Sequence, residues 1–450
     1  MKPRPDLPPG PHLVVGLARS GIAAALALRA RGEQVVGVDA GMPAGLDALS
    51  GTGVELHLEQ QGTALLERVN SVVKSPGVPA QAPVILEARS RGLCVLGELE
   101  LAWRMLPGEI IAVTGTNGKT TTVEWIGHIH RQAGLSAVVA GNVGAALSGL
   151  VDRVEEQVTI ICEVSSFQLE DTLAFSPEAA VLLNVSADHL DRHGTLAAYL
   201  AAKLEIFARQ GAQDLAVVPV GFQPEKPVGA ARRVSFGSGP DAQLSEQDGV
   251  LCWEGRPLVA AKQLALRGRH NMENAMAAAA VCLARGIDLD SVRDGLRSFA
   301  GVRHRLEEIA DVDGVSFVND SKATNVASTL VALEAVAGDA QDGAHPIHLI
   351  LGGQGKGQDF TPLRASVQKR CRAVYLIGED APAIARALQG ISTPVHDCEE
   401  LERAVAEAGA AARGGETVLL SPGCASFDQF ADFEARGECF RKLVLNLEGP

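Results

Sequence analysis

The chain has 450 residues, 46% of them hydrophobic and 4% aromatic, and its 40 basic and 54 acidic side chains give a formal net charge of −14. This length predicts three domains of ordinary globular size, and an acidic balance without a basic stripe excludes nucleic-acid binding through overall charge. Residues 1–10 lack the apolar core of a signal peptide and no run of about 18 apolar residues occurs, so we expect no membrane insertion.

Strand-like and helix-like patterns alternate along almost the whole chain, which predicts an α/β fold with parallel sheets. Buried-strand patterns lie at residues 12–16, 34–39, 71–74, 109–114, 158–164 and 179–185. Helical patterns lie at residues 22–31, 87–91, 97–104, from 119 onward, 195–210 and 271–285. Residues 221–257 mix Gly, Pro and short β-prone pieces, and we expect a small antiparallel excursion there.

The third part of the chain carries four more buried-strand patterns, at residues 315–319, 347–351, 374–377 and 417–420. Leu-Pro-Gly at residues 106–108 and Ala-Gly-Val at residues 300–302 are the candidate boundaries. The sequence therefore predicts three α/β domains, over residues 1–107, 108–301 and 302–450.

A phosphate-binding loop is the most informative motif. The strand pattern at residues 110–114 is followed by Gly-Thr-Asn-Gly-Lys-Thr and then by a helix. Glycines let backbone N–H groups approach phosphate oxygens, the helix N-terminus adds partial positive charge, and the lysine and threonine serve the outer phosphates and Mg²⁺. The expected ATP contacts are Gly115, Thr116, Asn117, Gly118, Lys119, Thr120 and Thr121.

This motif is a shortened one, because Val113 stands where the full G-x-x-x-x-G-K-[ST] pattern has its first glycine. The alternative interpretation is a glycine turn that opens a helix, with an incidental lysine. The strand before it and the helix after it favour phosphate binding.

Four segments stand out in the first two-thirds of the chain: Gly-Thr-Asn-Gly-Lys-Thr at 115–120, Glu-Val-Ser-Ser-Phe-Gln-Leu at 163–169, Asn-Val-Ser-Ala-Asp-His-Leu-Asp at 184–191 and Ala-Ala-Lys at 201–203. Their order and spacing resemble those of the Mur ligases of peptidoglycan synthesis, and the whole chain resembles that family's three-domain plan. The resemblance implies a Rossmann-like N-terminal domain, a P-loop-type central ATPase domain and a Rossmann-like C-terminal domain. Residues 165–168, 319–325 and 421–430 resemble the members that add D-glutamate.

The resemblance implies ATP-dependent ligation of D-glutamate to UDP-N-acetylmuramoyl-L-alanine. A substrate carboxylate would attack the γ-phosphate of ATP to form an acyl phosphate, and an amine would displace phosphate through a tetrahedral intermediate. Both steps gather negative charge, so metal ions and cations should converge on the site.

The metal and catalytic set implied by the family comprises Lys119, Thr120, Glu163, His189 and Lys203. Glu163 ends an apolar strand, where the alternative is a solvated glutamate, and a loop histidine such as His189 is by itself more often structural. Lys203 by itself reads as an exposed helix lysine. The family implies instead that CO₂ carbamylates it, which would let it help hold Mg²⁺ or a second divalent ion.

Nucleotide contacts beyond the loop are implied for Asn274 on the adenine side, and for Arg305 and Asp320 from the third domain. For Arg305 the alternative is a surface ion pair with Glu307 or Glu308. Asn142 and Gln168 match positions that handle the muramoyl substrate or its phosphates.

The other two substrates would bind in the outer domains. Residues 14–21 followed by Asp39 form a poor dinucleotide fingerprint, since Ala18 replaces the middle glycine. In the family this domain holds UDP, which implies contacts from Arg19, Ser20, Asp39, Ser75 and Gly77. Gly41 stands where relatives often have a basic residue. For D-glutamate the implied contacts are Lys322, Thr324, Lys356, Ser426, Phe427 and Phe433, with a solvent-exposed loop lysine as the alternative for Lys356.

Three rival functions remain: an amide ligase of the same build that uses another amino acid or folate, a nicotinamide-dependent oxidoreductase based on residues 16–39, and a non-catalytic nucleotide-binding switch. The eight cysteines are scattered and form no CxxC pair, which indicates a reducing cytoplasm. We expect a cytoplasmic monomer.

Overall fold

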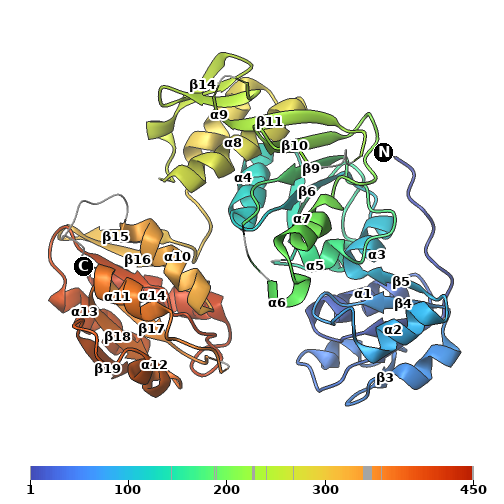
Figure 1. Cartoon of the computed structure of the whole chain (residues 1–450), viewed down its shortest axis with the longest axis horizontal. Coiled ribbons are helices and arrows are strands. Elements are labelled where there is room, and N and C mark those ends of the chain that lie inside the picture. The colour runs from blue at the N-terminus through green and yellow to red at the C-terminus, as the bar shows by residue number, and fades with distance from the viewer. Residues whose placement is uncertain are drawn as a thin grey trace. The chain divides into compact units, whose positions relative to one another are not determined.

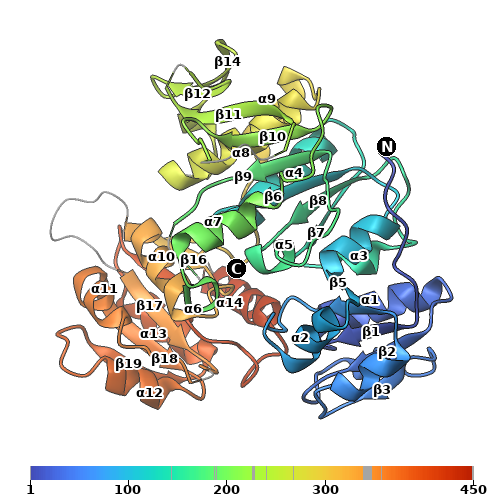
Figure 2. The same cartoon turned by 45° about the vertical axis from the view of Figure 1, so that its right-hand side comes forward.

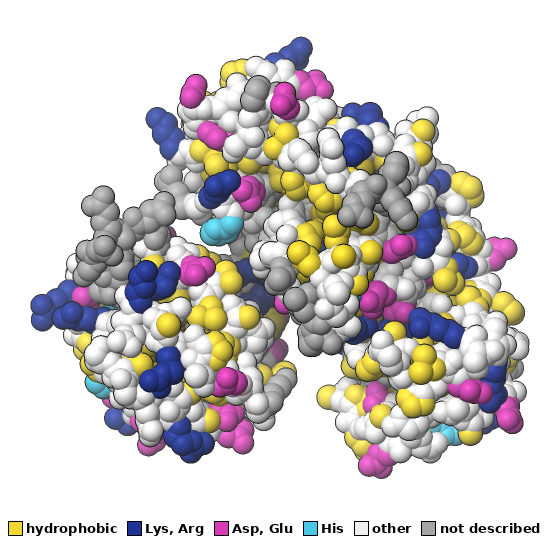
Figure 3. All heavy atoms as spheres, in the orientation of Figure 1, with side chains coloured by type: hydrophobic (Ala, Val, Ile, Leu, Met, Phe, Trp, Pro, Cys, Tyr) yellow, Lys and Arg dark blue, Asp and Glu magenta, His cyan; other side chains and the backbone are white. Residues whose placement is uncertain are grey.

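The computed structural model describes residues 2–142, 144–186, 188, 190–224, 229–239, 241–266, 268–337, 347–355 and 357–447. The chain divides into two compact units, Met1–Ala300 and Gly301–Pro450, which are described separately (Figures 1 and 2). Among the described residues, no helix combines the length and apolar character needed to cross a membrane. On the face drawn in Figure 3, basic and acidic side chains are scattered among one another.

The first unit begins with a five-stranded parallel sheet in the order β3-β2-β1-β4-β5. Its strands are β1 (His12–Val15), β2 (Val35–Val38), β3 (Glu55–His57), β4 (Ser71–Lys74) and β5 (Cys94–Gly97). Helices α1 (Arg19–Ala30) and α3 (Glu98–Met105) share an apolar core that continues into the second sheet, while η2 (Thr63–Arg68) and α2 (Pro83–Ser90) belong to a separate core cluster. The carboxyl ends of β1, β2 and β4 therefore meet at one edge, where an α/β sheet binds its ligand.

The second sheet has nine strands in the order β14-β13-β12-β11-β10-β9-β6-β8-β7. Its parallel part comprises β6 (Ile110–Thr114), β7 (Ala137–Gly141), β8 (Thr159–Glu163), β9 (Ala179–Leu182), β10 (Leu215–Pro219), β11 (Arg232–Ser238) and β12 (Leu244–Gln247), and its antiparallel end β13 (Val250–Trp253) and β14 (Arg256–Ala260). The helices are α4 (Lys119–Gln132), α5 (Ser166–Leu169), α6 (Leu190–His193), α7 (Leu196–Leu204), α8 (Arg269–Ala284) and α9 (Leu289–Ser298), and α4, α8 and α9 pack together. Strand β6 lies between β8 and β9, so the loop after it emerges at the middle of the parallel part.

The second unit is a six-stranded sheet in the order β15-β16-β20-β17-β18-β19, antiparallel only between its first two strands. The strands are β15 (Glu307–Val312), β16 (Val315–Asn319), β17 (Ile347–Gly352), β18 (Cys371–Ile377), β19 (Val395–Glu399) and β20 (Thr417–Leu420). Helices α10 (Val326–Ala337), α11 (Leu363–Arg370) and α12 (Ala381–Ala387) share one apolar cluster, and α13 (Leu401–Ala411) and α14 (Phe433–Leu447) share another.

Three local predictions need correction. The helix expected over 195–210 ends at Leu204, because the chain continues through turns with i to i−3 hydrogen bonds such as Phe207 N–H to Leu204 O, 3.0 Å. The strand expected over 179–185 ends at Leu182, after which Asn184 turns to bind the phosphate loop. Within 221–257 the antiparallel pairing begins only at β12, and β11 pairs in parallel with both neighbours. The domain boundaries at 107/108 and 301/302 stay predictions.

Candidate active site

The phosphate loop runs from the end of β6 into α4, and the side chain of Asn274 packs against it. Gly118 has φ +84°, and a Cβ there would lie 2.1 Å from Asn274 Oδ1 on α8. Asn274 is buried. This position therefore requires glycine both for its left-handed backbone and for the approach of the asparagine.

Asn184, just after β9, fixes the loop from the other side. Its side-chain oxygen accepts from Asn117 N–H at 2.9 Å, its amide donates to Asn117 O at 3.2 Å, and its backbone oxygen accepts from Thr116 N–H at 3.0 Å. Asn184 belongs to the motif at 184–191, but the sequence prediction gave it no role. These three bonds fix the backbone of the loop at Thr116 and Asn117.

Thr120 and Glu163 meet at the carboxyl edge of the sheet. The Thr120 hydroxyl donates to Glu163 Oε2 at 2.7 Å, and Asn142 Nδ2 donates to Glu163 Oε1 at 3.0 Å. Glu163 is 2% exposed, so it is not a solvated strand-end glutamate. Three of the predicted residues thus form one oxygen-rich cluster.

Two lysines converge on the Gly115 carbonyl oxygen. Lys119 Nζ donates to it at 2.9 Å and to Thr116 O at 2.8 Å, and Lys203 Nζ donates to it at 2.8 Å. Lys203 is 1% exposed and lies 4.4 Å from the ring centroid of buried Tyr199. Burial, reinforced by the nearby charge of Lys119, lowers the pKa of Lys203 to about 7. The exposed-helix interpretation of this lysine is therefore wrong.

His189 lies outside the described residues, so its place in the metal set stays a prediction. Within the described part of the chain, no group of three or more His, Cys, Asp or Glu side chains is arranged as a metal site. Gln168 is buried and forms a capping box with Ser165, in which its Oε1 accepts from Ser165 N–H at 2.9 Å. Its amide oxygen thus has a structural partner at the start of α5.

The predicted UDP residues gather at the carboxyl edge of the first sheet. Asp39 accepts from Leu17 N–H at 2.7 Å and from Gly41 N–H at 2.9 Å, and the Ser75 hydroxyl donates to Gly16 O at 2.6 Å. These bonds tie the turn after β1 to the loops after β2 and β4. Ser20 lies half-buried in the first turn of α1. A Cβ added at Gly77 would meet no atom within 4 Å, so packing does not require glycine there.

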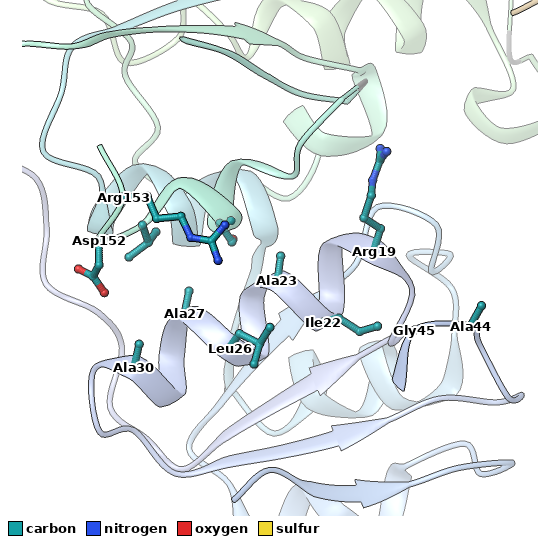
Figure 4. Close-up of a pocket in the computed structure, with 13 residues that line it drawn as sticks. Arg19, Ile22, Ala23, Leu26, Ala27, Ala30, Ala44, Gly45, Asp152 and Arg153 are labelled. Atoms are coloured by element: carbon teal, nitrogen blue, oxygen red, sulfur yellow. The ribbon is translucent and has the colours of Figure 1, made fainter. Parts of the chain in front are cut away.

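Arg19 connects this edge to the second sheet, since its guanidinium donates to Asn142 O at 3.3 Å. A cavity of about 620 Å³ begins beside Arg19 and follows the apolar face of α1 through Ile22, Leu26 and Ala30 toward Arg153 (Figure 4). No residue of the phosphate loop lines it. Of the predicted UDP contacts, Arg19 alone lines this cavity.

In the second unit, Asp320 is a buried residue of the segment 319–325. It accepts from the Ser421 hydroxyl at 2.8 Å and from Leu306 N–H at 3.2 Å, and burial raises its pKa to about 7 against the opposing effects of these bonds and of Arg305. Arg305 is half-buried and electrostatically coupled to Asp320.

Arg436 joins the two segments that carry four of the predicted D-glutamate residues, namely Lys322 and Thr324 on one and Ser426 and Phe427 on the other. This arginine is 1% exposed and donates to Ser321 Oγ, Ser321 O, Cys424 O and Ala425 O at 2.9–3.3 Å. Burial lowers its pKa to about 10. The sequence prediction missed Arg436 because an arginine in an amphipathic helix ordinarily faces solvent.

The individual D-glutamate residues differ in exposure. Ser426 is buried, Phe427 is 61% exposed, Thr324 is exposed, and Lys322 Nζ lies 5.9 Å from the ring centroid of Phe433. Lys356 lies outside the described residues. The described residues of this set thus include hydroxyl, ammonium and aromatic groups that follow the carboxyl ends of β16 and β20.

Three family models match the chain in order. They are the Mur ligase MurD-like N-terminal domain over residues 11–97, the Mur ligase middle domain over 113–282 and the Mur ligase glutamate ligase domain over 304–424. The UDP-N-acetylmuramoylalanine–D-glutamate ligase of Acidobacterium capsulatum is 40% identical over 97% of this chain and 96% of that protein. The chain belongs to the Mur ligase family. The family resemblance drawn from the four sequence segments is confirmed.

Other similarities agree with this Mur ligase assignment. The UDP-N-acetylmuramoylalanine–D-glutamate ligase of Anaeromyxobacter dehalogenans is 42% identical over 96% of each chain. Among solved structures, the UDP-N-acetylmuramate-alanine ligase MurC of Thermotoga maritima aligns with a TM-score of 0.57 at 20% identity, over 97% of this chain and 100% of that one. FolC of E. coli aligns with a TM-score of 0.56 at 18% identity, over 77% and 92%. At these identities the structures concern the fold alone, and the predicted three-domain α/β plan is confirmed.

Proposed function

We propose that this Mur ligase joins D-glutamate to UDP-N-acetylmuramoyl-L-alanine, with cleavage of ATP to ADP and phosphate, in the synthesis of peptidoglycan precursors. The observation that carries the proposal is the near-full-length similarity to relatives named for this reaction. The convergence of Lys119, Thr120, Glu163 and Lys203 at the loop after β6 supports it. We further propose that the enzyme acts as a cytoplasmic monomer, which agrees with its eight free cysteines.

The site suits ATP and Mg²⁺. Magnesium prefers oxygen ligands, and Thr120 and Glu163 present oxygens 2.7 Å apart in a buried position. These two residues would hold the ion, with His189 and carbamylated Lys203 serving it or a second divalent ion, and the metal would neutralise phosphate charge. The remaining nucleotide contacts would come from residues 115–121, Asn274, Arg305 and Asp320.

The reaction begins when a carboxylate oxygen of the muramoyl substrate attacks the γ-phosphorus of ATP and ADP leaves. The amine of D-glutamate then adds to the acyl carbon, and phosphate departs with the former carboxylate oxygen. The backbone N–H groups of the loop and the ammonium of Lys119 stabilise the charge that develops on the transferring phosphoryl group. Glu163 and Lys203 are both buried, so water is excluded from this part of the site and electrostatic interactions within it are strengthened.

Lys203 is chemically suited to carbamylation. Only a neutral amine attacks CO₂: a bond forms between Nζ and the carbon, and the nitrogen releases a proton. Because its pKa is lowered to about 7, a large fraction of Lys203 is neutral at physiological pH, unlike an ordinary lysine. The product would be an anion beside the loop instead of a second cation on the Gly115 carbonyl.

The substrates would bind at the edges described above. UDP and the muramoyl group would contact Arg19, Ser20, Asp39, Ser75, Gly77, Asn142 and Gln168. D-Glutamate would contact Lys322, Thr324, Lys356, Ser426, Phe427 and Phe433.

Phosphate release with each amino acid tests the proposal. The purified chain is incubated with ATP, Mg²⁺ and UDP-N-acetylmuramoyl-L-alanine, and D-glutamate is compared with L-glutamate, L-alanine, L-lysine and meso-diaminopimelate. We expect stimulation by D-glutamate alone. Stimulation by another amino acid, or release that does not depend on the UDP precursor, would refute the assignment.

A further inference from the structure

A buried ion pair joins the predicted UDP loop to the segment that carries Glu163. Lys74 Nζ lies 2.5 Å from Asp171 Oδ2, and the two side chains are 0% and 2% exposed. Arg89 of α2 approaches the other carboxylate oxygen at 3.4 Å. The pair lies wholly within the first unit, between its two sheets.

Each partner lies next to proposed substrate contacts. Lys74 is the last residue of β4, directly before Ser75, whose hydroxyl binds the turn after β1. Asp171 follows the short helix α5, three residues after Gln168 and eight after Glu163. A shift at either partner would therefore move a substrate loop relative to Glu163.

The backbone at Asp171 is equally fixed. Its carbonyl oxygen accepts from Gly97 N–H at 2.9 Å, and a Cβ on Gly97 would lie 3.0 Å from Asp171 Cβ. Asp171 thus contacts the last residues of two adjacent strands: its side chain pairs with Lys74 of β4, and its backbone oxygen binds Gly97 of β5. A surface ion pair could not define a position in this way.

A second connection follows the same route. Arg192 of α6 donates to Pro76 O at 3.2 Å and to Glu170 Oε2 at 3.3 Å, and its guanidinium carbon lies 3.9 Å from the ring centroid of Phe167. Arg192 therefore also links the loop at residues 75–77 to the segment at residues 166–170.

We propose that the Lys74–Asp171 pair is a positioning device that sets the UDP loop at residues 75–77 relative to the Glu163–Gln168 segment, so that the bound precursor presents its carboxylate to the phosphate loop. This inference rests on the proposed function. Neither residue touches substrate; each acts through its neighbour in the chain. Burial lowers the pKa of Lys74 and Asp171 opposes this, so the ammonium depends on its partner to remain charged.

The test replaces both charges with apolar groups of similar size, in the double variant Lys74→Met with Asp171→Leu. Removing both partners of a buried pair commonly preserves stability, because no buried charge is left uncompensated. Arg89, which also approaches Asp171, is 45% exposed and stays solvated. We expect the KM for UDP-N-acetylmuramoyl-L-alanine to rise about tenfold while the KM values for ATP and D-glutamate stay within about twofold, since only precursor placement changes. Titration calorimetry with the precursor alone should show the same loss of affinity.

A matched control pair exists in the same unit. Lys2 Nζ lies 2.6 Å from Asp214 Oδ2, with side chains 25% and 8% exposed, and neither residue adjoins a proposed substrate contact. The variant Lys2→Met with Asp214→Leu should leave all three KM values unchanged, whatever its thermal stability. An equal rise in precursor KM in this control would show that the effect is a general loosening, and the proposal would fall.

The outcomes separate the inference from the function. If wild-type enzyme shows no D-glutamate-dependent phosphate release, the proposed function fails. If wild-type enzyme is active and the folded double variant keeps a wild-type precursor KM, the positioning role fails. If the double variant does not fold, Lys74→Gln with Asp171→Asn, which also removes both charges, is measured instead. The same selective rise in KM then supports the role, and unchanged values overturn it.

Discussion

Replacing Gly118 by alanine probes the geometry of the phosphate loop most sharply. The new Cβ would lie 2.1 Å from Asn274 Oδ1, 2.9 Å from its Cγ and 3.1 Å from its Nδ2, so the asparagine side chain must move. A left-handed alanine costs about 1–2 kcal/mol, and forcing a buried side chain off its rotamer adds about 1 kcal/mol. We therefore expect Gly118→Ala to lower the free energy of unfolding by about 2–3 kcal/mol.

We expect Gly118→Ala to weaken ATP binding as well. The displaced asparagine and the redirected loop N–H groups each lose contacts with the nucleotide. One lost hydrogen bond to a charged group is worth about 1.5–3 kcal/mol, which corresponds to a rise of roughly 10- to 100-fold in the ATP dissociation constant. Titration calorimetry with a non-hydrolysable ATP analogue and Mg²⁺ measures this constant directly.

The other end of the same helix supplies the control. Gly134 follows α4 with φ +69°, and a Cβ there meets nothing within 4 Å. Gly134→Ala should therefore carry only the backbone strain of about 1–2 kcal/mol and leave ATP binding unchanged.

Relief of the clash is a second check. Asn274→Ala removes all three contacting atoms, so the double variant with Gly118→Ala should be about 1 kcal/mol more stable than the sum of the single changes predicts. If the free-energy changes of the two single variants simply add in the double variant, or if Gly118→Ala keeps the wild-type ATP dissociation constant, the packing of Asn274 on the loop is not the basis of phosphate binding.

Three further changes have defined outcomes. Because the pKa of Lys203 is about 7, its neutral fraction rises from about one-tenth at pH 6 to about nine-tenths at pH 8. At a fixed concentration of dissolved CO₂, activation of CO₂-depleted enzyme should therefore be faster at pH 8, and Lys203→Met should abolish that activation. The pKa of aspartate is near 3.8 in the unfolded chain and about 7 for Asp320 in the folded one, so wild-type stability falls as pH rises between these values. Asp320→Asn should remove this fall, and urea unfolding at pH 8 should show a gain on the order of 1 kcal/mol or more. The same change should weaken ATP binding. Arg436→Met removes four hydrogen bonds to buried acceptors, and we expect it to destabilise the second unit by about 3–5 kcal/mol and raise the KM for D-glutamate, with Arg436→Lys intermediate. Unchanged melting would contradict its role.

The sequence predicted interior strands far better than edge strands. The strands at residues 12–15, 35–38, 71–74, 110–114 and 159–163 were predicted because their side chains are buried on both faces and read as continuous apolar runs. The strands β3, β5, β7, β15 and β19, which were missed, all lie at sheet edges. Edge strands are partly solvated, as the exposed residues of β3 and β19 show, so hydrophobic pattern alone does not mark them. Interior β10 is the exception, since it was missed although four of its five residues are buried.

At the candidate site, the charged groups were predicted from the sequence, whereas the residues that position them are known only from the structure. The predicted lysines, Thr120 and Glu163 meet at one loop, as the motif order implied. Asn184, Arg436 and the Lys74–Asp171 pair were missed, because each acts through contacts 67 to 115 positions away in the chain. No local periodicity or motif encodes such contacts; they exist only once the sheets are assembled.

Oxygen transfer from the precursor to phosphate is the most direct test of acyl-phosphate chemistry. UDP-N-acetylmuramoyl-L-alanine labelled with ¹⁸O in its alanyl carboxylate is incubated with the enzyme, ATP, Mg²⁺ and D-glutamate, and the released phosphate is analysed by mass spectrometry. The proposed mechanism predicts one ¹⁸O atom in each released phosphate and one phosphate for each D-glutamate joined, and it predicts no sustained phosphate release over many turnovers when D-glutamate is omitted. Unlabelled phosphate would mean that water, not the precursor carboxylate, attacks ATP, and would contradict the ligase assignment.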